Sequence, residues 1–178
     1  MESLLEINQQ LNALGYTLEA FSHADENALY DIFRNVVDSG SQFPYGWNTL
    51  QEFRSQFLGK RSNVYVCHSS DNEVIGGFYI KPNFPHRSIL IANAAYMVHE
   101  AYRGHGIGTL MIKASLHIAK ELGFQAMQFN LVFSKNIPAI NLYQKLGFDI
   151  IGTIPEVIQN TDGSWQEGYI MYRKLENL

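Results

Sequence analysis

The sequence predicts one α/β domain in which helices cover the faces of a mixed sheet. Its 178 residues suit a single compact domain, residues 1–178, and are too few for two separate catalytic domains. Hydrophobic residues make up 46% of the chain and charged residues 17%, which supplies a core and excludes intrinsic disorder. The hydrophobic residues recur at helical spacing in some segments and alternate as in strands in others.

The first half of the chain is predicted to contain three helices and three strands. Leucine and isoleucine recur at helical spacing before Gly15, and glycine commonly ends a helix. Thr49 and Glu52 have the spacing of a capping box that opens a later helix. The expected elements are helix 4–14, strand 16–20, helix 23–37, helix 49–57, and a hairpin of strands 64–68 and 74–80.

Strands and helices alternate in the second half. Asn136 is a good N-cap for one helix, and Gly123 and Gly147 each follow the last residue of a helical pattern. A polar segment, residues 159–166, is typical of a loop. The expected elements are strand 89–98, helix 109–122, strand 126–133, helix 137–146, and strands 148–154 and 168–175.

The charge balance excludes one class of function and the hydropathy another. Seventeen acidic and thirteen basic residues give a formal charge of −4, which argues against a general nucleic-acid binder. No segment approaches the roughly 20 apolar residues of a membrane span, and residues 1–10 lack a basic leader. We therefore expect a soluble protein whose anionic ligand, if it has one, is held by local geometry.

Cysteine and histidine do not indicate a metal site. Cys67 is the only cysteine, so the chain can form neither an intramolecular disulfide nor a zinc site made of cysteines. His99, His105 and His117 are not spaced as a helical ligand pair. We expect no metal, and a reducing, cytoplasmic compartment.

The segment from Arg103 to Thr109 carries the strongest chemical signal. It contains Gly104, Gly106 and Gly108 and lies between an apolar strand and an apolar helix. Glycines allow a tight turn and a close approach to a ligand, while the amides of a helix's first turn favour an anion such as a phosphate. The loop lacks the lysine of a Walker loop and the glycine spacing of a dinucleotide fingerprint.

This loop resembles the Arg/Gln-x-x-Gly-x-Gly/Ala motif of the GCN5-related N-acetyltransferase (GNAT) superfamily. Arg103, Gly106 and Gly108 match the motif, and residues 136–148 look like the second signature of that family. The two signatures occur in the right order and cover about residues 89–154. The resemblance implies a mixed, mostly antiparallel central sheet flanked by helices, with acetyl-coenzyme A (acetyl-CoA) as the cosubstrate.

The resemblance also implies which residues bind acetyl-CoA. Arg103 belongs to the motif, Asn136 would contact the cofactor arm, and Tyr143 would bring its hydroxyl near the thioester sulfur. The strand end formed by Tyr96, Met97 and Val98 would pair with the pantetheine arm. The pyrophosphate would lie on the main-chain amides of Gly104, His105, Gly106, Ile107, Gly108 and Thr109.

The chemistry of acetyl transfer gives a role in catalysis to Val98, Tyr143 and a further residue, Asn130. The main-chain amide of Val98 would stabilise the developing oxyanion, and Tyr143 would act as the acid for the departing thiolate. Residues 128–132, where family members often have a carboxylate base, contain no acid. Asn130 lies there; it can orient an acceptor but cannot take a proton at neutral pH. Deprotonation through water, or an acceptor that is already partly neutral, is therefore expected.

A second resemblance suggests the acceptor. Residues 77–83, 93–94 and 129–132 look similar to fungal acetyltransferases that modify azetidine-2-carboxylate, a proline analogue. In those enzymes asparagines at places like Asn93 and Asn130 hold the small acceptor. Amide donors facing a carboxylate would explain asparagine here, because a glutamate would repel it. We expect a small amine acceptor, with amino and imino acids as the candidate class.

Other interpretations of these residues remain open. Tyr143 could pack on a helix face, and Asn93 and Asn130 could satisfy strand main chains. Residues 43–47 contain Phe43, Pro44, Tyr45 and Trp47, which suit either the core or an acceptor wall.

Other functions also remain open. The acceptor could be a polyamine, an antibiotic or a peptide N-terminus, and the chain could instead be a non-catalytic CoA sensor or a nucleotide-phosphate binder. An exposed sheet edge near the C-terminal strands could support a homodimer.

Overall fold

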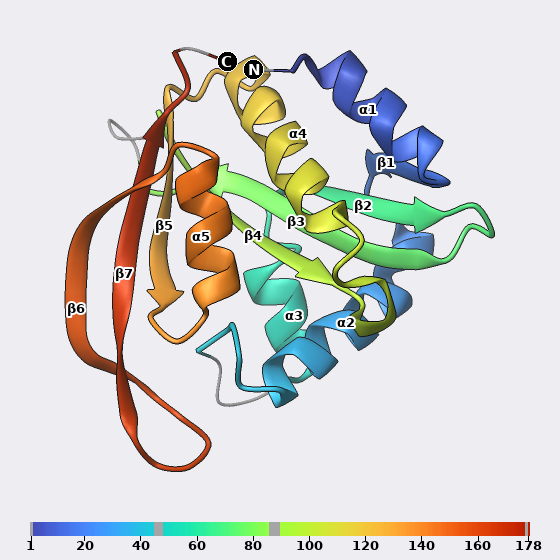
Figure 1. Cartoon of the computed structure of the whole chain (residues 1–178). Helices are drawn as coiled ribbons and strands as arrows, with labels where there is room; N and C mark the ends of the chain where they lie inside the picture. Colours follow the sequence, from blue (N-terminus) through green and yellow to red (C-terminus); the bar gives the residue numbers. More distant parts are fainter. Residues whose placement is uncertain (1, 45–47, 86–89, 177) are drawn as a thin grey trace.

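A seven-stranded sheet forms the centre of the protein, in the order β1-β2-β3-β4-β5-β7-β6. The computed structural model describes residues 2–44, 48–85, 90–176 and 178. Within these residues the sheet is antiparallel except for one parallel pair, β4 and β5. Figure 1 shows β6 and β7 as a long hairpin that extends beyond the other strands. The mixed α/β fold expected from the sequence is confirmed.

The helices and strands follow the expected order. The helices are α1 (Leu4–Ala13), α2 (Glu26–Asp38), α3 (Leu50–Gln56), α4 (Ile107–Glu121) and α5 (Ile137–Lys145), with short 3-10 turns η1 (His23–Asp25) and η3 (Glu100–Tyr102). The strands are β1 (Tyr16–Ala20), β2 (Asn63–Ser69), β3 (Val74–Pro82), β4 (Ile91–Val98), β5 (Ala126–Phe133), β6 (Asp149–Gln159) and β7 (Trp165–Lys174).

Most boundaries shift by one to three residues, and three differences have a clear structural cause. The helix expected over 23–37 begins as a 3-10 turn, and its α-helical part starts at Glu26. Helix α4 starts at Ile107 rather than at Thr109, because Gly106 adopts a left-handed conformation (φ 82°) and caps the helix. β6 continues to Gln159 through a bulge marked by Glu156 (φ 46°), so the loop expected over 159–166 is shorter. An edge strand faces solvent widely, so it can carry polar residues that are typical of a loop.

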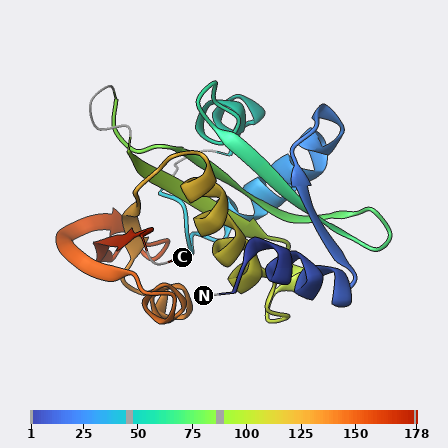
Figure 2. The ribbon, with the colours of Figure 1, turned by 90° about the horizontal axis from the view of Figure 1, so that it is seen from above.

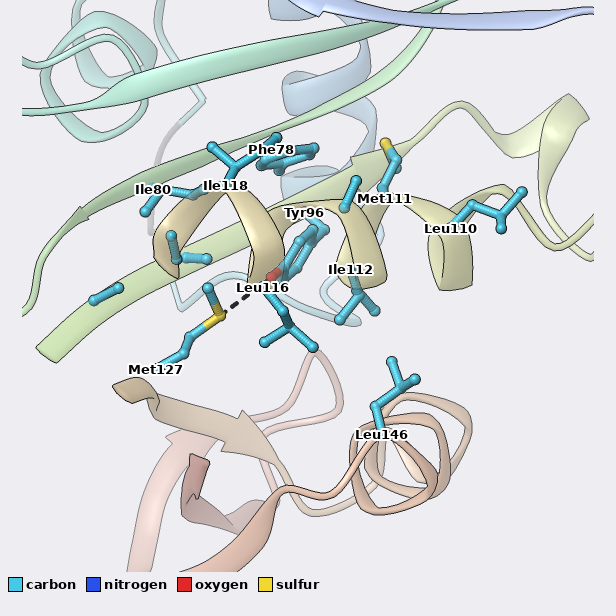
Figure 3. Close-up of a cluster of buried hydrophobic side chains, with 14 of the residues drawn as sticks. Phe78, Ile80, Tyr96, Leu110, Met111, Ile112, Leu116, Ile118, Met127 and Leu146 are labelled. Carbon is cyan, nitrogen blue, oxygen red and sulfur yellow. Dashed lines mark hydrogen bonds between the residues drawn. The ribbon is translucent and has the colours of Figure 1, made fainter. Parts of the chain in front are cut away.

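Two hydrophobic clusters hold the helices on opposite faces of the sheet. The larger one joins α1, α4 and α5 to the strands, and the smaller one joins α2 and α3 to the other face. Figure 2 shows the sheet between these two layers of helices. In Figure 3, α4 places Met111 and Leu116 against Phe78, Tyr96 and other strand residues. Because both faces are covered, the strands cannot shift freely and their ends are fixed in space.

Strand β4 separates from β5 after a short common stretch. Only two pairs join them, Ile91 with Ala126 and Ala92 with Met127. Further along, β5 contains a register shift between Phe129 and Val132 relative to β7, as in a β-bulge. The two strands thus form a V-shaped opening on the side where α4 and α5 begin.

No helix in the described residues is long and apolar enough to cross a membrane.

Candidate active site

The main chain of β4 is exposed along this opening at alternate residues. The hydrogen bond from His99 N to Ile75 O, at 2.8 Å, fixes which residues of the antiparallel pair bond to β3. By this alternation Met97 directs its main chain to β3, while Tyr96 and Val98 direct theirs toward β5. No acceptor among the described residues bonds to the amides of Tyr96 and Val98. The expected pairing surface is therefore present at Tyr96 and Val98.

Met97 differs from the expectation. Its main chain lies on the β3 side, opposite Gly77, and its side chain is buried in the cluster formed with α2 and α3. Since neighbouring residues of a strand point their main-chain groups in opposite directions, Met97 cannot share the cleft edge with both of its neighbours. Tyr96 and Val98, rather than Met97, therefore direct main-chain groups toward the cleft.

The glycine loop lies at the mouth of the same opening. Gly104 and Gly106 have φ values of 80° and 82°, which favour glycine, and a Cβ at either would meet nothing within 4 Å. No hydrogen bond joins the amides of residues 104–109 to an acceptor in the described part of the chain. Arg103 donates from Nε to Val98 O at 3.2 Å, which ties the loop to the end of β4. The loop offers a row of free amides at the N-terminus of α4, as an anion site requires.

A cavity of about 190 Å³ fills the opening between the separated strands. Its described wall includes Tyr143 and Asn136 at the α5 end and Asn93 and Asn130 on β4 and β5. With Tyr96, which also lines it, the fold brings five of the residues predicted from the sequence to one cavity. The described wall holds no aspartate, glutamate, histidine, lysine or arginine.

Tyr143 combines the packing role and the cavity position that the sequence left as alternatives. Its ring packs at 4.5 Å from Phe129 and 5.8 Å from Phe148, between centroids. Its hydroxyl has no hydrogen-bond partner among the described residues, and burial raises the pKa of this phenol above its usual value. Asn136 caps α5 by accepting from Ala139 N at 3.3 Å. Asn136 stands where β5 leads into α5, and Tyr143 lies about two turns further along this helix.

The match to known proteins agrees with this arrangement. The model of the Acetyltransferase (GNAT) family matches residues 27–148, which include both strands of the opening, the glycine loop and α5. This chain belongs to the GNAT acetyltransferase family. The first resemblance inferred from the sequence is thereby confirmed.

Individual relatives and solved structures support the assignment to this family. N-acetyltransferase aca1 of Schizosaccharomyces pombe is 41% identical over 83 residues, which cover 47% of this chain and 40% of that relative. The chain therefore aligns with less than half the length of aca1, a fungal N-acetyltransferase that is consistent with the second resemblance. A GNAT from Kribbella flavida has a TM-score of 0.85 and 31% identity, and the match covers 91% of this chain and 99% of that one.

A third match extends the likeness in fold. The phosphinothricin acetyltransferase (Pat) from Sinorhizobium meliloti, solved in complex with acetyl-CoA, has a TM-score of 0.81. Its sequence is 21% identical, and the match covers 90% of this chain and 88% of that one. The GNAT fold therefore extends over nearly the whole chain.

The two candidate acceptor residues of this GNAT are held by hydrogen bonds. Asn93 donates from Nδ2 to Gln128 O at 3.0 Å and accepts from the Tyr79 hydroxyl at 3.1 Å. Asn130 and Asn83 exchange hydrogen bonds of 2.6 and 3.1 Å between their amide groups. The expected alternative, that these asparagines satisfy strand main chains, is realised by Asn93, whose partner is a main-chain oxygen.

Residues that precede α3 form the remaining wall. Phe43 and Pro44 line the cavity, and Phe43 also stacks on Phe33 at 6.0 Å, so both expected roles occur together. Tyr45 and Trp47 lie outside the described residues. Gln42 also lines the cavity, and its Nε2 donates to Tyr96 O at 2.6 Å. No sequence signal points to Gln42, because a single glutamine in a loop belongs to no motif.

The described residues supply neither an activated cysteine nor a metal site for the chemistry of this GNAT. Burial raises the pKa of the Cys67 thiol to about 12, and this residue lies buried on β2, so it is not an activated nucleophile. Within the described residues, no group of three His, Cys, Asp or Glu side chains could hold a metal ion. The arrangement can bind an anion at the loop, an extended amide-bearing chain along β4, and a small neutral molecule in the cavity.

Proposed function

We propose that this chain transfers the acetyl group of acetyl-CoA to the amine of a small acceptor, with an amino or imino acid as the first candidate. One observation carries the proposal: the loop with its free amides is tied through Arg103 to the end of β4, and the free N–H edge of β4 leads at Tyr96 to the uncharged cavity. An extended ligand with an anionic end and an amide-bearing arm fits this order. Acetyl-CoA has that constitution, and the similar Pat structure holds it.

The fit to acetyl-CoA rests on the shape of the loop and strand. The open space at Gly104 and Gly106 leaves the amides of residues 104–109 accessible to a pyrophosphate. The N–H groups of Tyr96 and Val98 can bond to the carbonyls of a pantetheine arm. Asn136 lines the cavity beside Tyr143, where that arm would end.

The proposed mechanism assigns one task to each group. Bound acetyl-CoA supplies an acetyl thioester, whose carbon forms a bond to the acceptor nitrogen as its bond to sulfur breaks. The Val98 amide would donate to the carbonyl oxygen as negative charge develops there. The Tyr143 hydroxyl would donate to the leaving sulfur. Because a thiol has a pKa of about 8.5 and burial raises that of Tyr143, a hydrogen bond suffices and full proton transfer is unfavourable.

The acceptor nitrogen must lose a proton without a base from the protein. The described cavity wall carries no carboxylate or imidazole, so water is the expected proton acceptor. The same lack of carboxylates argues against a polyamine, whose several positive charges would need partners. The amides of Asn93 and Asn130 suit an acceptor with its own carboxylate.

We also infer a homodimer that forms through β6. This strand is the edge of the sheet, and Ile150, Ile151 and Val157 on it are 39%, 57% and 36% exposed. Sedimentation of the wild type and of Ile151→Lys tests this: the wild type should sediment as a dimer and the variant as a monomer.

The single, buried Cys67 further suits a reducing compartment, and we infer the cytoplasm.

The test of the proposed function is product formation. The pure protein is incubated with acetyl-CoA and a mixture of proline, azetidine-2-carboxylate, primary amino acids, polyamines and short peptides, and acetylated products are identified by mass spectrometry. Acetylation of amino or imino acids supports the proposal. Products from polyamines or peptides alone would contradict the acceptor class but keep the transferase. Saturable acetyl-CoA binding without any product would instead indicate a CoA sensor.

A further inference from the structure

Four side-chain amides line the described cavity wall, and they differ in one respect. These amides belong to Gln42, Asn93, Asn130 and Asn136. The carbonyl oxygens of the three asparagines each accept a hydrogen bond: from the Tyr79 hydroxyl, from Asn83 and Gln128, and from Ala139 N, respectively. Among the described residues no donor bonds to Gln42 Oε1. Within the described residues Gln42 Oε1 is therefore the one of these oxygens with both lone pairs available to a ligand.

The orientation of the Gln42 amide is determined by its partner. Tyr96 O can only accept a hydrogen bond, so the group that faces it at 2.6 Å must be the NH₂ of Gln42. The carbonyl oxygen of the same planar amide then points away from Tyr96. Gln42 lines the same cavity as Tyr143, whose hydroxyl is the proposed donor to the thioester sulfur, so the Gln42 amide belongs to the cavity in which the acetyl group would end.

The main chain on both sides of Gln42 is also held in place. Ser41 O accepts from Asn136 Nδ2 at 3.5 Å, and Ser39 Oγ lies 2.7 Å from Ser41 Oγ. On the other side, Phe43 stacks on Phe33 of α2. The segment thus spans from α2 to the start of α5 across the opening. A side chain held in this way loses little conformational entropy when a ligand binds.

We propose that Gln42 binds the acceptor amine, with Oε1 accepting a hydrogen bond from the nitrogen that attacks the thioester. This inference rests on the proposed function. A neutral primary or secondary amine has at least one N–H to donate while its lone pair remains free to attack. The described wall holds no carboxylate to pair with an ammonium ion, so desolvation disfavours the ammonium form and Gln42 Oε1 can hold the neutral, reactive amine.

The test is Gln42→Met, which keeps the length of the side chain and removes both hydrogen bonds, with Gln51→Met on the exposed face of α3 as the matched control. Initial rates are measured against the acceptor that the wild type acetylates, and acetyl-CoA affinity is measured by calorimetry. We expect kcat/KM for the acceptor to fall about tenfold in Gln42→Met, while the Kd of acetyl-CoA changes less than about twofold. Gln51→Met should behave as the wild type.

A second variant keeps an oxygen at this position. Gln42→Glu supplies a carboxylate that can take the acceptor's proton, so its kcat/KM should fall off at a lower pH than that of the wild type. Loss of acetyl-CoA affinity with unchanged acceptor KM would overturn the inference, because Gln42 would then serve the cofactor arm. Unchanged kinetics in both variants would overturn it too. If the wild type itself acetylates nothing, the proposed function fails. If the wild type is active and the Gln42 variants have the same kinetic constants as the wild type, only this inference is refuted.

Discussion

Asn93 on β4 bonds to the main chain of Gln128 on β5 at the point where the two strands separate. The distance from Asn93 Nδ2 to Gln128 O is 3.0 Å, one residue beyond the last paired position, Ala92 with Met127. A side chain thus replaces the main-chain bond that the diverging strand can no longer make. The hydrogen bond sets where the sheet stops and the cleft begins.

Asn93→Leu should therefore destabilise the fold. Loss of the bond leaves Gln128 O without its donor, which costs about 1–3 kcal/mol of the free energy of unfolding. Urea denaturation followed by circular dichroism measures this. Asn130→Leu, on the exposed side of the cavity, is the comparison and should cost less. Unchanged stability in Asn93→Leu with a large rise in acceptor KM would mean that Asn93 acts only on the acceptor.

Gly106→Ala should weaken acetyl-CoA binding beyond its effect on folding. Gly106 has a φ of 82° with open space at the Cβ position, so alanine costs about 1–2 kcal/mol in stability and places a methyl over the free amides. Gly163→Ala in the β6–β7 turn is the control, because its φ is 83° and its Cβ position is equally open. Calorimetry should show at least a tenfold rise in the Kd of acetyl-CoA for Gly106→Ala alone, a factor that corresponds to about 1.4 kcal/mol. Equal affinities in the two variants would remove the loop from the binding site.

Local signals explain what the sequence predicted well. The N-cap Asn136, the stop at Gly123 and the glycine loop each act within a few residues, so their consequences could be inferred without the fold. The sequence predicts a later start for α4 than the structure has, because glycines usually interrupt helices, whereas Gly106 caps this one and Gly108 lies within it.

Long-range contacts explain what the sequence could not predict. The insertion of β7 between β5 and β6 depends on pairing across the sheet. Gln42 reaches Tyr96 across 54 positions of the chain, and nothing near Gln42 in the sequence encodes that contact. The main-chain direction of Met97 depends on the register of β4 with β3, which no local pattern fixes.

Tyr143→Phe should lower turnover without affecting binding. The hydroxyl has no partner among the described residues, so its removal should change the free energy of unfolding by less than about 0.5 kcal/mol. If it donates to the leaving sulfur, kcat should fall about 10- to 100-fold while the Kd of acetyl-CoA stays constant. Tyr172→Phe on β7 is the matched control. Full activity in Tyr143→Phe would leave the ring with a packing role only.

Asp25 should stabilise the fold in a pH-dependent way. Its Oδ1 lies 3.0 Å from His68 Nε2; burial alone would raise the pKa of this carboxyl, but hydrogen bonds from His68 and Ser22 hold it below its usual value. A lowered pKa gives stability that is present above the unfolded value of about 3.9 and is lost as the pH falls through the folded pKa. The difference in unfolding free energy between wild type and Asp25→Asn should thus shrink below about pH 4. Denaturant titrations at pH 7 and pH 3 measure it, and a constant difference would contradict the pairing.

The pH dependence of catalysis should follow the acceptor rather than the protein. The described cavity wall holds no carboxylate or imidazole, so kcat/KM should rise tenfold per pH unit until the pKa of the acceptor's own ammonium group is reached. Burial raises the pKa of Tyr143, so its hydroxyl stays protonated and causes no loss of activity below about pH 10. Profiles of kcat/KM against pH for two acceptors whose amine pKa values differ show whether the acceptor's own ammonium group or a protein base sets the pH dependence. Their midpoints should differ by the same amount as the amine pKa values, whereas a shared midpoint for both acceptors would reveal a protein base that takes the proton.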